Sequence, residues 1–125
     1  MRTSVIEING EKHLLCFNLY AVKECSERYG SIVGINDAVH AGAEGKRIEE
    51  CLWLLSTLMR AGEMYAKESG ISDNPKALSV EQMLAVCDVG FFKGLGGRVI
   101  HAINDGMSVN VEVEDSKKEE TTQES

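Results

Sequence analysis

The chain has 125 residues, the length of one ordinary domain, and 43% of them are apolar. Its 20 acidic residues outnumber its 13 basic ones, which gives a formal net charge of −7. Such an acidic domain is repelled by phosphate backbones, so we expect no nucleic-acid partner. The apolar runs are far shorter than the ~20 residues that span a bilayer, and no apolar signal core opens the chain. We therefore expect a cytoplasmic protein with no membrane partner.

Two short apolar segments near the N-terminus flank the dipeptide Asn9-Gly10. Asn-Gly between apolar segments is the strongest short-range hairpin signal, because both residues tolerate positive φ. The sequence therefore predicts a β-hairpin over residues 3–17, with strands at roughly 3–8 and 12–17.

A first helix is predicted between Asn18, which can cap its start, and Gly30, which can end it. Its apolar residues recur at helical spacing and predict the buried face: Leu19, Val22, Cys25 and Tyr29. Residues 31–34 are expected to form a connector. Asn36-Asp37 would then cap one or two helical turns that end before Gly42.

The longest predicted helix covers residues 44–69, and Gly70 ends it. One side of the helix carries a continuous stripe of small and apolar residues: Ile48, Cys51, Leu52, Leu55, Leu58, Met59, Gly62 and Ala66. This stripe predicts the face that packs into the core.

The same helix carries further apolar residues outside this stripe. Trp53 and Met64 lie on the opposite side, while Leu54 and Tyr65 flank the stripe. A helix that is apolar over more than one face is either central in the core or offers a second face to a partner. Trp53 could pack beneath the hairpin; the alternative is that all four residues form a partner-binding face, since tryptophan is enriched at interfaces. We expect partner binding at these four residues.

Two further helices are predicted after the loop at residues 73–75. Ser79 and Gln82 form a capping-box pattern that starts the first of them. Its short apolar face consists of Val80, Met83, Leu84 and Cys87. Asp88 can cap the next one, whose apolar residues recur to about Asn104. The glycines within 90–97 either break this helix or let another backbone come close.

The last residues are predicted to leave the helical pattern. Asp105-Gly106 is typical of a turn, and valine alternates with polar residues over 109–113, as in an edge strand. Residues 115–125 contain no apolar side chain, so we expect a disordered acidic tail. The predicted fold is α+β and mainly helical. It is one globular domain over residues 1–114, in which the N-terminal hairpin packs on four to five α-helices within 18–105.

No pattern in the chain predicts catalysis. The four cysteines, Cys16, Cys25, Cys51 and Cys87, form no CxxC pair, and their apolar neighbours indicate reduced, buried thiols. The glycines at 90–97 lack the Gly-Lys-Ser/Thr ending of a phosphate loop. His101 and the carboxylate pairs, Glu49-Glu50 among them, are expected on solvated helix faces. We therefore expect no enzyme, and no catalytic, cofactor-binding or metal-binding residue.

The order of elements resembles the small tail assembly chaperones of long-tailed, siphovirus-type bacteriophages and prophages. The resemblance covers roughly residues 4–105, and its most specific stretch runs from Phe17 to Gly30. It continues with Leu52-Trp53-Leu54-Leu55 and with residues 78–82, which read Leu-Ser-Val-Glu-Gln. The glycine-rich segment 90–97 departs from the charged helix of the family.

The resemblance implies a non-enzymatic protein that binds the tape-measure protein, keeps it soluble and helps recruit tail-tube subunits. Such proteins are absent from the finished virion. Many also have a longer form made by a ribosomal frameshift, and the pair Lys117-Lys118 is compatible with a frameshift site. An alternative is a bacterial regulatory adaptor or antitoxin-like binding protein, and a toxin gene next to this one would favour it. Exposed apolar residues and an edge strand would permit a homo-oligomer.

Overall fold

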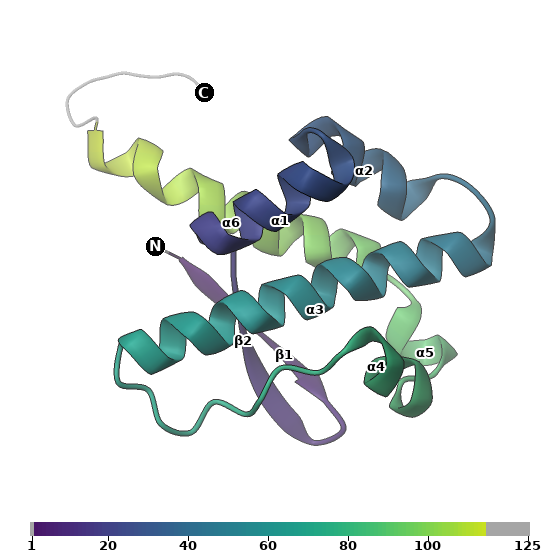
Figure 1. The fold of residues 1–125 in the computed structure, drawn as a ribbon, viewed down its shortest axis with the longest axis horizontal. Coiled ribbons are helices and arrows are strands. Elements are labelled where there is room, and N and C mark those ends of the chain that lie inside the picture. Colours follow the sequence, from purple (N-terminus) through teal and green to yellow (C-terminus); the bar gives the residue numbers. More distant parts are fainter. Residues whose placement is uncertain (1, 115–125) are drawn as a thin grey trace.

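The chain folds as an N-terminal hairpin followed by six helices, within the part that the computed structural model describes (Figure 1). The description covers the backbone of residues 2–114 and the side chains of residues 2–31 and 33–107. The strands are β1 (Thr3–Ile8) and β2 (Glu11–Cys16). The helices are α1 (Leu19–Tyr29), α2 (Ile32–His40), α3 (Glu44–Glu68), α4 (Val80–Val86), α5 (Val89–Phe92) and α6 (Leu95–Glu114). The mainly helical α+β fold is confirmed, with six helices in place of four to five.

The hairpin forms where Asn-Gly predicts it. Asn9 and Gly10 have φ values of 54° and 85°, the left-handed conformation that a two-residue turn requires. The strands pair antiparallel from Ile8 opposite Glu11 to Thr3 opposite Cys16, so β2 begins one residue earlier than predicted. Ile6 and Ile8 of β1 and Leu15 of β2 are buried, which fixes the register of the hairpin against the helices.

α3 crosses the centre of the molecule (Figure 1). α1 and α2 lie along one side of it, the segment with α4 and α5 lies on the other, and the hairpin and α6 also contact it. Seven residues of the predicted stripe are buried: Cys51, Leu52, Leu55, Leu58, Met59, Gly62 and Ala66. Gly62 brings α3 against β2, because a Cβ at this position would lie only 2.0 Å from the carbonyl oxygen of Leu14.

In the first two helices, the capping residues agree with the helix ends better than the apolar spacing agrees with the buried face. The Asn18 side chain accepts a hydrogen bond from the Ala21 N–H, and Gly30 ends α1 at φ 79°. The predicted buried face is wrong in part, because α1 buries Ala21 and Cys25 while Leu19 is 84% exposed. α2 was expected to start at Asn36-Asp37 but begins at Ile32, since the Ser31 hydroxyl caps it by accepting from the Gly34 N–H.

The C-terminal elements confirm both predicted caps and overturn the predicted turn and strand. Ser79 and Gln82 form the capping box of α4, and the Asp88 side chain caps α5. Gly94, at φ 74°, breaks the helix before α6. α6 then continues through 105–106 and 109–113, where a turn and an edge strand were expected. Gly106 is a close-packing residue, since an added Cβ would lie 2.6 Å from Cβ of Phe17. The predicted tail, 115–125, lies outside the described residues.

His13 is a buried polar residue in the hairpin. It is 1% exposed, it lies opposite Ile6, and neither ring nitrogen has a hydrogen-bond partner among the described residues. Burial lowers the pKa of His13 from 6.5, and this effect outweighs the Glu11 carboxylate, which acts in the opposite direction. The imidazole is therefore neutral in the folded protein at pH 7.

We expect stability to fall as the pH drops below 6.5, the ordinary pKa of this histidine. In that range the unfolded chain binds a proton at His13 that the folded chain excludes, which costs up to about 1.4 kcal/mol per pH unit. Urea unfolding at pH values above and below 6.5 measures the slope. His13→Leu should remove this component, whereas His40→Gln, at an exposed histidine, should keep it. An unchanged slope in His13→Leu would contradict the assignment.

Candidate protein-binding site

The four residues expected to form a partner-binding face do not share one exposed surface. Leu54 is 0% exposed, so its assignment to this face is wrong. Trp53 and Tyr65 are half-buried and pack against the core, while Met64 is 43% exposed. The reason is the central position of α3, which neighbouring elements cover on several sides. The interpretation that places this helix centrally in the core is confirmed, and partner binding at Trp53, Met64 and Tyr65 stays a prediction.

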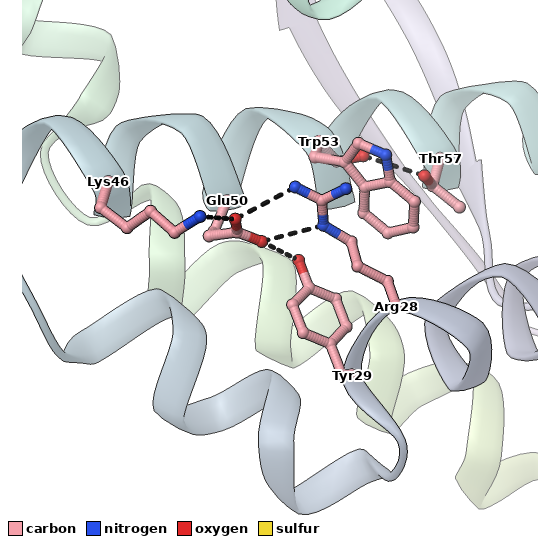
Figure 2. A network of polar contacts seen from close by, with 6 residues as sticks. All are labelled: Arg28, Tyr29, Lys46, Glu50, Trp53 and Thr57. Carbon is pink, nitrogen blue, oxygen red and sulfur yellow. Dashed lines mark hydrogen bonds and ion pairs between the residues drawn. The ribbon is translucent and has the colours of Figure 1, made fainter.

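Trp53 packs against the C-terminal end of α1. Its ring meets the Tyr29 ring edge to face, with centroids 5.8 Å apart and planes at 82°. The guanidinium carbon of Arg28 lies 4.5 Å from the Trp53 ring centroid, a cation–π contact (Figure 2). This packing places Trp53 at the α1–α3 junction, whereas the alternative interpretation placed it beneath the hairpin.

Glu50 lies at the centre of a polar network at the same junction (Figure 2). Arg28 donates from Nε and Nη2 to the two Glu50 carboxylate oxygens, both at 3.0 Å. The Tyr29 hydroxyl donates to the same carboxylate at 2.6 Å, and the Lys46 ammonium lies 3.0 Å from it. Glu50 is 5% exposed, so the expectation that Glu49-Glu50 faces solvent holds for Glu49 and is wrong for Glu50. The Lys46–Glu50 spacing, one helical turn, is the only sequence signal that points to this network.

The network binds helices together and does not prepare an acid or a base. The Arg28 hydrogen bonds, helped by Tyr29 and Lys46, outweigh burial and lower the pKa of Glu50 to about 2. Burial and the Glu50 carboxylate raise the pKa of the Tyr29 hydroxyl. The carboxylate is therefore ionised at neutral pH and its oxygens are already bonded, so it has no capacity to take a proton from a substrate.

The four cysteine thiols are held in the protonated form. Burial raises the pKa of all four thiols, that of Cys25 to about 11, which opposes thiolate formation. Cys16, Cys25 and Cys51 are buried as expected, and Cys87 is half-buried. Within the described part of the chain, no three His, Cys, Asp or Glu side chains gather as metal ligands. His101 is exposed on α6 and pairs with Asp105 at 3.3 Å.

An apolar groove lies between α3, α4 and α5, with a cavity of about 340 Å³. Residues from all three helices line this α3–α5 groove: Glu44, Ile48, Leu52, Met83, Leu84, Cys87, Asp88, Val89, Phe91 and Phe92. Leu84 is 55% exposed and Val89 is 74% exposed, and the neighbouring Val86 is 50% exposed. The sequence predicted an apolar face on α4, but of its side chains only Met83 is buried. α4 and α5 have seven and four residues, too few to cover one another's apolar side chains.

The segment before α4 is fixed by side chains, which places one wall of the groove. The Asn74 side chain accepts a hydrogen bond from the Leu14 N–H at 2.8 Å, so the loop is joined to β2. Glu63 of α3 accepts from the Ala77 N–H at 3.1 Å. The Ser56 hydroxyl of α3 donates to the Leu78 carbonyl oxygen at 2.7 Å. α4 therefore starts at a defined position beside α3, and the groove is a preformed feature of the fold.

None of the protein-family models, curated proteins or solved structures compared with this chain matches it. Over residues 2–114, no helix combines the length and the apolar character needed to cross a bilayer.

Proposed function

We propose that this protein is a tail assembly chaperone of a long-tailed bacteriophage or prophage. In this function it binds apolar segments of the tape-measure protein in the host cytoplasm, keeps them soluble and helps recruit tail-tube subunits, without entering the finished virion. The α3–α5 groove, whose lining residues Leu84 and Val89 are exposed, is the observation that carries the proposal. The sequence resemblance over residues 4–105 supplies the particular family.

The physical basis is burial of apolar surface on both partners. Each Å² of apolar surface removed from water stabilises a complex by about 25 cal/mol, so exposed aliphatic side chains beside a groove favour an apolar partner. A tape-measure protein is long, helical and apolar in stretches, and unshielded copies would aggregate. The net charge of −7 on the chaperone would keep the complex dispersed.

Val89→Lys is expected to reduce several-fold the amount of tape-measure protein kept soluble when the two proteins are co-expressed. A lysine here places a charge on the groove, which disfavours contact with an apolar segment. The measurement is the fraction of tape-measure protein from the same genome that remains in the supernatant and co-purifies with the chaperone.

Val33→Lys is the matched control. Val33 and Val89 are both 74% exposed and both lie in the first turn of a helix, but Val33 belongs to α2 and does not line the groove. The control should solubilise as much tape-measure protein as the unchanged chain. Equal losses in the two variants would remove the groove from the proposal. Failure of the unchanged chain to retain any tape-measure protein would overturn the proposed function itself.

A further inference from the structure

The α3–α5 groove combines apolar walls with two carboxylates. Glu44 is the first residue of α3, and Asp88 caps α5; no basic side chain is among the residues that line the groove. Neither carboxylate forms an ion pair with any described side chain. Lys46, close to Glu44 in sequence, is bound to Glu50 instead. Both carboxylates are thus available to a cation supplied from outside.

The walls of the groove also restrict the backbone conformation of an occupant. The lining residues belong to helices or to the caps Cys87 and Asp88 between α4 and α5, and no strand contributes an open backbone edge to the lining. An extended segment laid against these walls would leave its own N–H and C=O groups without partners, which costs free energy. A helix carries its backbone hydrogen bonds with it, so it can place side chains in the groove without this cost.

We propose that the α3–α5 groove binds an amphipathic helix whose aliphatic edge is flanked by lysine or arginine side chains that pair with Glu44 and Asp88. The aliphatic side chains would enter the cavity above Ile48, Leu52 and Met83, and the flanking cations would set the position of the helix. The inference rests on the proposed function only for the identity of the partner as the tape-measure protein, because the binding chemistry is a property of the groove.

Two synthetic helical peptides test this chemistry. They share one leucine-rich edge on an alanine background and differ only in their flanking residues, lysine in one and glutamate in the other. Fluorescence anisotropy with the full chain should give a Kd about tenfold or more lower for the lysine peptide, as expected for charges that meet complementary partners. The difference should shrink at high salt.

The variant Glu44→Gln with Asp88→Asn should bring the two peptides to within about twofold of each other. Asparagine caps helices about as well as aspartate, so α5 should remain formed. The matched control is Glu7→Gln with Glu68→Gln, which removes the same charge at two exposed residues outside the groove and should keep the full difference. Val89→Lys should weaken binding of both peptides.

Equal loss of discrimination in the two double variants would overturn the inference, because net charge alone would then explain the preference. Peptide binding that is indifferent to Val89→Lys would overturn it as well. A failure of this inference can be distinguished from a failure of the proposed function. If the peptides behave as expected while the tape-measure protein stays insoluble, the groove chemistry stands and the chaperone assignment fails.

Discussion

Replacing Gly62 with alanine is expected to lower the free energy of unfolding by about 3 kcal/mol, the upper part of the usual range for overpacked positions. The new Cβ would lie 2.0 Å from the Leu14 carbonyl oxygen and 2.6 Å from its carbon. Both are backbone atoms, so no side-chain rotation relieves the overlap, and α3 must move away from β2. Urea denaturation of the variant and the unchanged chain measures the difference.

Gly45→Ala serves as the control on the same helix. An added Cβ at Gly45 meets nothing within 4 Å, so the substitution should raise stability by up to about 1 kcal/mol through helix propensity alone. Opposite signs at the two positions would establish that the close approach, and not the loss of a glycine, destabilises the fold. If Gly62→Ala destabilised the protein no more than an ordinary surface substitution does, α3 and β2 would not meet as described.

Glu50→Ala is expected to destabilise the protein by about 2–3 kcal/mol. The change removes the acceptor of the Arg28 and Tyr29 hydrogen bonds and leaves Lys46 without its partner. The cost stays below that of a fully buried ion pair, because the Arg28 side chain is 35% exposed and can regain water. Thermal and urea unfolding measure the loss. Glu49→Ala, at the exposed neighbour, should change stability by no more than about 0.5 kcal/mol.

The pH dependence of this loss identifies its cause. Folding lowers the pKa of Glu50 from 4.5 to about 2, so the folded state binds fewer protons there than the unfolded state. The stabilisation is therefore complete above about pH 4.5 and declines as the pH falls toward 2. The difference between the unchanged chain and Glu50→Ala should shrink over that range. A difference that does not vary with pH would point to lost packing and not to the ionised carboxylate.

Local signals in the sequence predict several elements of the fold. Asn9-Gly10 determines the hairpin turn. The predicted helix caps are also confirmed at Asn18, Ser79 and Asp88. These features depend on residues adjacent in the chain, so one stretch of sequence contains the whole signal. The buried stripe of α3 is also predicted, because a long helix repeats its period many times.

Features that depend on distant contacts could not be predicted from the sequence. Leu54 is buried because several elements surround α3, and Glu50 is buried because Arg28 and Tyr29 of another helix reach it. The valines at 109–113 alternate as in a strand, yet the backbone there is helical. The α3–α5 groove was missed for a related reason. Its apolar residues have the sequence pattern of core residues, and only the arrangement of two short helices leaves them uncovered.

The central position of α3 has a consequence for synthesis on the ribosome. The hairpin and α1 are made before α3, but both pack against residues that lie in α3, such as Gly62 against Leu14. A nascent chain that has emerged only through Ala41 therefore carries a hairpin and two short helices with no core to join. A two-stranded hairpin alone is marginally stable at best. Cooperative folding thus requires residues of α3 to have left the ribosome, and the earlier apolar side chains stay accessible until then.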